Sequence, residues 1–308
     1  MQETTFATAP TDAPTPPDVP RWKYWLMFSP LARIAWFAAM TYIYFRGALR
    51  IAQVLGWVSL GATPLQQALA NNLVVLVPVL IAYLGLVNWF ERRPVTELTR
   101  KAPLLGLAGL AGGVGLFSAV VAVLWIAGSY HVTGTNTHVD WVAEVLLYGL
   151  CAGLAEEIVT RGVLFRICEQ GLGTWFGLAI SAAFFGAAHL QNPNATWWAA
   201  AAIAIEAGLL LAMLYHVTRS LWPCVGLHAG WNVAQGTLYG IPVSGNDTQG
   251  FLVSNRTGPD WLISGAFGAE ASVIALGRCS IVTIALIVVA LRRGSIVPPF
   301  WNRHRIAD

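Results

Sequence analysis

Charged residues are scarce in this chain of 308 residues: 11% are Asp, Glu, Lys or Arg, whereas 56% are hydrophobic. A soluble domain carries about 25% charged residues. The shortfall excludes a water-soluble fold and predicts a polytopic membrane protein. The net charge is only +3, and the basic residues gather at the ends of apolar segments. This distribution is explained by membrane topology and gives no reason to expect a nucleic-acid partner.

Cysteine and most known catalytic motifs are also lacking. Four cysteines lie in or beside apolar segments without a C-x-x-C pair, and we interpret them as small buried residues: Cys151, Cys168, Cys224 and Cys279. The chain has no H-E-x-x-H, G-x-S-x-G, Walker or dinucleotide-binding motif. Residues 1–20 do not form a cleavable signal peptide, and their composition predicts a disordered cytoplasmic tail.

Long apolar segments, by contrast, are abundant. Eight of them are predicted to be membrane-spanning helices, at roughly 31–58, 68–90, 104–128, 139–168, 173–190, 195–218, 220–239 and 272–291. Because Arg46 and Arg50 interrupt the first segment, it remains open whether that segment is one full span. We therefore predict an all-α bundle of about eight transmembrane helices. Its parts are the tail, N-terminal helices over 21–138, a core over 139–291 and a cytoplasmic C-terminal tail over 292–308.

The loops between these segments predict the orientation. Lys and Arg occur in alternate loops, whereas loops 59–67, 129–138 and 191–194 contain neither, and loop 240–271 contains only Arg256. Basic loops remain in the cytoplasm. Both termini are therefore predicted to be cytoplasmic, in a multi-pass protein of the cell membrane, most simply a bacterial inner membrane.

Two adjacent acids, Glu156 and Glu157, lie within the fourth apolar segment. Acids inside membrane spans are costly and usually functional. Glu157 and Arg161 are four residues apart on one helix face, which predicts an ion pair. Glu156 has no cation near it in sequence, which suits a general base that acts on water. A purely structural ion pair would explain Glu157 well and Glu156 poorly.

His189 and His228 lie in later apolar segments. Glu156 precedes the turn at Leu172 by 16 residues and His189 follows it by 17, so a helical hairpin would place both about 25 Å from that turn. His228 and Asn232 share one helix face and could orient a water or donate to an oxyanion. Glu206 and Glu270 are weaker candidates for a direct role. Glycines near the two histidines, among them Gly226, would allow helices to approach closely.

At these residues the chain resembles the CAAX prenyl protease and bacteriocin-processing (CPBP, or Abi) family of intramembrane proteases. The E-E-x-x-x-R motif is Glu156 to Arg161, F-x-x-x-H is Phe185 to His189, and H-x-x-x-N is His228 to Asn232. The resemblance covers roughly residues 140–275 and implies an eight-helix bundle with its site inside the membrane. It implies an endopeptidase of membrane-associated peptides or proteins, with water activated by Glu156 and His189. His228 and Asn232 would hold the scissile carbonyl oxygen, and Glu157 and Arg161 would support the first motif.

The resemblance leaves several alternatives open. Glu156, His189 and His228 could bind zinc or another divalent metal, or act without a metal. The loop-poor architecture resembles bacterial members, so prenylated CAAX substrates are not expected. A non-catalytic immunity or scaffold protein of the same fold is the main alternative, and an ion-coupled transporter is a more distant one. The family's site is expected near the cytoplasm, whereas the hairpin places Glu156 past mid-membrane, so the side of substrate entry is open.

Overall fold

The computed structural model describes residues 20–99 and 103–303, and these are mostly helical. The first half contains α1 (Arg21–Phe28), α2 (Pro30–Val54), α3 (Pro64–Asn71), η1 (Asn72–Leu76), α4 (Val77–Gly85), η2 (Leu86–Phe90), α5 (Pro103–Ile126), β1 (Tyr130–Thr135), α6 (Trp141–Glu144), η3 (Val145–Ala152), α7 (Gly153–Glu157) and η4 (Ile158–Phe165). Residues 1–19 of the predicted N-terminal tail lie outside the described residues.

The second half continues the same pattern. It contains α8 (Arg166–Leu172), α9 (Thr174–Ala188), η5 (His189–Gln191), α10 (Trp197–Ile203), η6 (Ala204–Leu209), α11 (Leu210–Thr218), α12 (Trp222–Asn232), η7 (Val233–Leu238), β2 (Leu252–Arg256), α13 (Asp260–Ile263), η8 (Ala269–Ala271), α14 (Val273–Arg292) and α15 (Phe300–Arg303). The last two helices reach into the predicted tail 292–308, of which residues 304–308 lie outside the described part.

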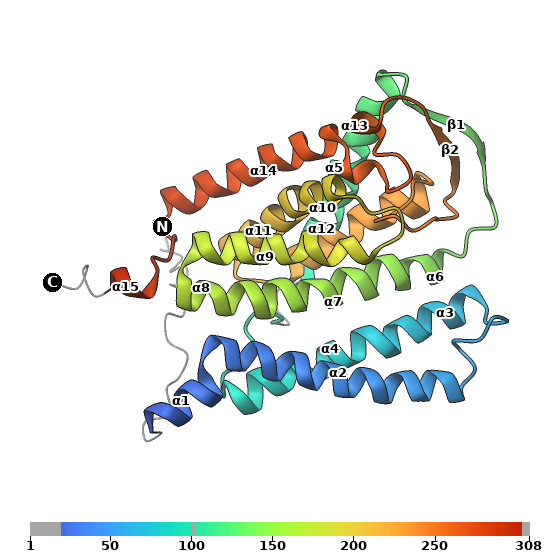
Figure 1. Cartoon of the computed structure of the whole chain (residues 1–308). Helices are drawn as coiled ribbons and strands as arrows, with labels where there is room; N and C mark the ends of the chain where they lie inside the picture. The colour runs from blue at the N-terminus through green and yellow to red at the C-terminus, as the bar shows by residue number, and fades with distance from the viewer. Residues whose placement is uncertain (1–19, 100–102, 304–308) are drawn as a thin grey trace.

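The long helices lie side by side (Figure 1). One end of the bundle carries α1, α8 and α15, and we call it the α1 end. The other carries β1, β2, α3, α6 and α13, and we call it the strand end. Each predicted apolar segment coincides with a helical stretch, several of them composed of α-helix and wider π-helix in succession. The prediction of an all-α membrane bundle is confirmed.

Four described helices are long and apolar enough to cross a membrane, namely Pro64–Phe90, Leu104–Ile126, Trp197–Thr218 and Val273–Arg292. The other predicted spans are shorter, as in α9 with 15 residues, or carry more charge, as in the stretch from α6 to α8. Lipid-facing residues such as Ile281 and Ile284 on α14 are 68% and 59% exposed. The chain is a multi-pass membrane protein, and the total of eight spans stays a prediction.

Helix ends follow local capping rules. Ser29 caps α2 ahead of Pro30, and Thr63 forms a capping box with Gln66 at the start of α3. The predicted turn between the fourth and fifth segments is formed by Gly173, whose φ of 85° separates α8 from α9. The sequence did not predict α1 or the antiparallel pair of β1 with β2.

The closest helix packing joins α5 to α12. A Cβ placed on Gly226 would lie 2.0 Å from the Gly106 oxygen, and one on Gly113 would lie 2.1 Å from the Leu227 oxygen. The predicted close approach is therefore real at Gly226, but it brings α12 against α5. It does not draw the two histidine helices together, because Gly186 of α9 instead meets the Ala200 oxygen of α10.

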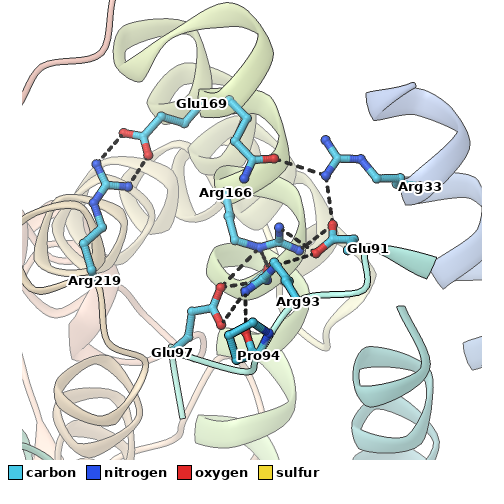
Figure 2. A network of polar contacts seen from close by, with 10 residues as sticks. Arg33, Glu91, Arg93, Pro94, Glu97, Arg166, Glu169 and Arg219 are labelled. Carbon is cyan, nitrogen blue, oxygen red and sulfur yellow. Dashed lines mark hydrogen bonds and ion pairs between the residues drawn. The ribbon is translucent and has the colours of Figure 1, made fainter. Parts of the chain in front are cut away.

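Buried ion pairs fill the α1 end. Figure 2 shows Glu91 between two guanidiniums, with Arg33 at 2.9 Å and Arg166 at 3.0 Å. Arg93 contacts Glu91 at 2.7 Å and Glu97 at 2.8 Å. We call these five residues the ion-pair cluster. It joins α2, the loop after η2 and α8.

Candidate active site

Glu157 and Arg161 form the predicted ion pair, with their charged groups 2.8 Å apart and both side chains fully buried. Arg161 also donates to Thr160 and to the backbone oxygens of Ala207 and Gly208. Its guanidinium lies over the Phe185 ring at 4.6 Å. These contacts tie η4 to η6 and α9, so Arg161 holds together three of the helices around the site.

His228 completes the environment of Glu157. Its Nδ1 lies 2.9 Å from Glu157 Oε1, the same oxygen that accepts from Arg161. The carboxylate can only accept, so Nδ1–H donates. This orients the ring and points Nε2 toward Glu156, whose Oε2 is 4.0 Å away. The sequence predicted only the ion pair of Glu157 with Arg161 and did not predict that Glu157 also accepts a hydrogen bond from His228.

Glu156 differs from its neighbour in exposure and contacts. Its side chain is 39% exposed, and its Oε2 has no hydrogen-bond partner among the described residues. Since Glu157 is fully buried and doubly bonded, the two adjacent acids have separate environments, as the sequence predicted. Glu156 lines a cavity with its exposed part and keeps Oε2 as a buried acceptor without a hydrogen bond among the described residues.

His189 lies at the end of α9, where the helix tightens into η5. Its Nδ1 is 2.8 Å from the Phe185 oxygen, so Nδ1–H donates to that carbonyl and Nε2 is left for other partners. The ring lies against Phe185, with centroids 4.7 Å apart, and Phe185 also contacts His228 at 6.1 Å. Phe185 thereby positions both histidines and Arg161.

Glu156, His189, His228 and Asn232 line one cavity of about 990 Å³, which includes its open mouth. We call it the site cavity. Asn232 donates one amide hydrogen to the Tyr148 oxygen at 3.3 Å and keeps a second for another acceptor. The structure therefore brings the candidate residues of all three motifs together. Polar walls that the sequence did not single out are Asn71, Tyr148, Asn192, Ser244 and Asn246.

A second cavity also reaches Glu156 and His189. It is lined mainly by apolar residues of α4, η4 and α9, including Val79, Val159 and Phe184. Because Glu156 and His189 line both spaces, they lie where a polar and an apolar cavity meet.

Glu206 and Glu270 lie in a smaller cavity behind the histidines, with His228 and Ser244 also in its lining. Glu270 accepts from the Ser244 backbone N–H at 2.6 Å. Burial raises the pKa of Glu270 to about 7, against the opposing effect of hydrogen bonds from Ser244 and Gln235. Glu270 therefore supports the wall of the site cavity, and neither acid belongs to the group around Glu156.

The possible metal ligands do not form a metal site. Within residues 20–99 and 103–303, no three His, Cys, Asp or Glu side chains are placed so that they could hold one ion. The Nδ1 hydrogen bonds of His228 and His189 leave Nε2 free in each ring, so this conclusion rests on the placement of the side chains and not on a lack of free nitrogens. The residues present do not fit a metal centre, so no catalytic step below uses a metal.

Comparison with known proteins agrees with the motifs. Residues 138–234 match the family model described as type II CAAX prenyl endopeptidase Rce1-like. This range contains all six candidate residues and ends shortly after Asn232. No curated protein matches the chain.

Proposed function

We propose that this chain hydrolyses a peptide bond of a membrane-associated peptide or protein, because residues 138–234 match the model of type II CAAX prenyl endopeptidases. The observation that carries this proposal is Glu156, an acid whose side chain is 39% exposed and lines a cavity shared with two histidines. A general base must lie within hydrogen-bond reach of the water it activates. A water held between the Glu156 carboxylate and His189 Nε2 in this cavity would meet this condition.

The reaction would begin when Glu156 removes a proton from this water, and the water oxygen attacks the scissile carbonyl carbon. The negative charge that develops on the carbonyl oxygen would be met by His228 Nε2–H and by the second amide hydrogen of Asn232. This role requires that the His228 ring carry both protons, and Glu157 would support that form because it accepts from Nδ1–H. When the carbon–nitrogen bond breaks, Glu156 returns its proton to the leaving amine.

The test compares Glu156→Gln with Glu144→Gln in detergent, using a quenched fluorescent peptide library in micelles. Glu144 lies on the same helical stretch and does not line the site cavity. Loss of a general base typically lowers the rate 10²–10⁴-fold, so we expect cleavage by Glu156→Gln to fall by at least 100-fold while Glu144→Gln remains active. Equal cleavage by the wild type and Glu156→Gln would refute the role of Glu156. A wild-type chain that binds peptides without cleaving them would favour a non-catalytic immunity or scaffold role.

A further inference from the structure

The mouth of the site cavity lies toward the strand end. Its wall is formed where helices meet loops at that end: Asn71 ends α3, Asn192 follows η5, and Ser244 and Asn246 lie in the loop after η7. Figure 1 places α3, α6 and the two strands together there. A peptide that enters through this mouth would pass the amide and hydroxyl groups of these residues before it reaches Glu156.

The opposite end is filled by packed side chains. Along the helix from Glu156 toward the α1 end, the next charged groups are Glu157 and Arg161, which are both fully buried, and Arg166 of the ion-pair cluster follows. Near that cluster, Glu169 accepts from Arg219 and contacts His216 Nδ1 at 2.5 Å (Figure 2 shows its pair with Arg219). Arg166, Glu169 and His216 are each no more than 5% exposed. Within the described residues, the site cavity therefore reaches the strand end, whereas the charged groups between Glu156 and the α1 end are buried against one another.

The two ends also differ in charge. Arg92, Arg292 and Arg293 are exposed at the α1 end, and Arg100 and Lys101 belong to the same loop region in the sequence. Loops 59–67, 129–138 and 191–194, all at the strand end, contain no Lys or Arg. The one basic residue of loop 240–271, Arg256, donates to the backbone oxygens of Ile263 and Gly265.

Arg46 and Arg50 are exceptions, since they lie on the half of α2 that approaches the strand end. They are part of a helix and not of a loop, and Arg46 donates to the Tyr42 hydroxyl one turn earlier. The positive-inside bias is counted over loops. It therefore still assigns the α1 end to the cytoplasm.

Exposed tryptophans mark both membrane boundaries. Trp22, Trp25 and Trp89 at the α1 end are 69%, 66% and 73% exposed. Trp125 and Trp197, near the strand end, are 67% and 82% exposed. Tryptophan is enriched at both membrane–water interfaces. Since Trp197 begins α10, only five residues after Asn192 of the cavity wall, the mouth lies close to the interface at the strand end.

We propose that the site cavity admits its substrate from the non-cytoplasmic face of the membrane. The substrate class that follows is the peptide segment that an exported or membrane-anchored protein presents on that face. The assignment of a substrate rests on the proposed peptidase function, whereas the side on which the cavity opens does not depend on it.

Two matched variants test the orientation. Asn246→Cys places a thiol at the mouth, and Asn302→Cys places one on α15 at the α1 end; both asparagines are exposed. The four native cysteines are buried, so the wild-type chain gives the labelling background. A membrane-impermeant maleimide is applied to intact bacterial cells that produce each full-length variant, and to inverted membrane vesicles.

In intact cells we expect at least tenfold more labelling at Asn246→Cys than at Asn302→Cys, and the reverse in inverted vesicles. Labelling of Asn302→Cys in intact cells, or of Asn246→Cys in inverted vesicles only, would overturn the proposal. Because labelling requires no catalysis, this result is independent of whether Glu156→Gln abolishes cleavage. A failed peptidase assay with the expected labelling would refute the enzyme and leave the orientation standing.

Discussion

Replacing Arg161 by Met should lower the stability of the protein, because it leaves the carboxylate of Glu157 buried without its main positive partner. Arg161 and Glu157 are both fully buried, and Arg161 donates to Glu157, Thr160 and two backbone oxygens of η6. Met keeps much of the side-chain length but leaves Glu157 with His228 as its remaining described partner. Breaking a buried pair by removing one partner costs about 3–5 kcal/mol, because it leaves an uncompensated buried charge. At roughly 2 °C per kcal/mol for a chain of this size, the unfolding temperature should fall by about 6–10 °C.

The double variant Glu157→Gln with Arg161→Met decides whether charge is the cause. It removes the carboxylate as well, so its loss of stability should be smaller than that of Arg161→Met alone, by about 2 kcal/mol or more. Thermal unfolding in detergent, followed by tryptophan fluorescence, measures Arg161→Met, Glu157→Gln and the double variant under one condition. If the double variant is as unstable as the sum of the two single variants, Glu157 and Arg161 are not coupled, and the reasoning fails.

Two further predictions concern packing and pH. Gly113→Ala places a Cβ 2.1 Å from the Leu227 oxygen and should destabilise the α5–α12 contact by about 3 kcal/mol. Its control is Gly112→Ala, whose Cβ would have nothing within 4 Å and which should be neutral or slightly stabilising. Similar unfolding temperatures of the two variants would contradict the close approach of the helices. Although burial disfavours its charged form, Glu91 has a pKa below its usual value because Arg166, Arg93 and Arg33 surround it. Its stabilising contribution is therefore present above the ordinary carboxyl pKa of about 4.3 and is lost as the pH falls through the lower folded value. Unfolding temperatures measured from pH 7 down to pH 3 should decline more steeply for the wild type than for Glu91→Gln, and parallel profiles would show that Glu91 is not held in its charged form.

The sequence predicted those parts of the site that depend on one helix or one hairpin. The Glu157–Arg161 pair follows from a spacing of four residues, and the shared position of Glu156 and His189 follows from counting residues to the turn at Gly173. The contact of His228 with Glu157 joins residues that are 71 positions apart, so no local spacing could reveal it. Phe185 was identified as the first residue of the F-x-x-x-H motif, but its contacts with His228 and Arg161 join distant segments and could not be predicted from local spacing.

The fold shows the same limit. Hydropathy located every long helix, because lipid selects for apolar length. It located neither α1, with only eight residues, nor the strands β1 and β2, which acquire their hydrogen bonds from distant segments. It also could not predict that π-helical turns flank α7, where Glu156 and Glu157 lie. Such turns widen the helix and change which side chains share a face.

The pairing of β1 with β2 has a consequence for the order in which the molecule is completed. Tyr130 of β1 pairs with Arg256 of β2, and four of the eight predicted apolar segments lie between the two strands in the chain. Domains form from the N-terminus during synthesis, so β1 remains without its partner until α12 and η7 have been made. Ser244, which lies in the same loop as β2, and Glu270, which holds it, are made only then. Because this part of the cavity wall is made late, a shorter chain lacks part of the surface that would receive a peptide under the proposed function.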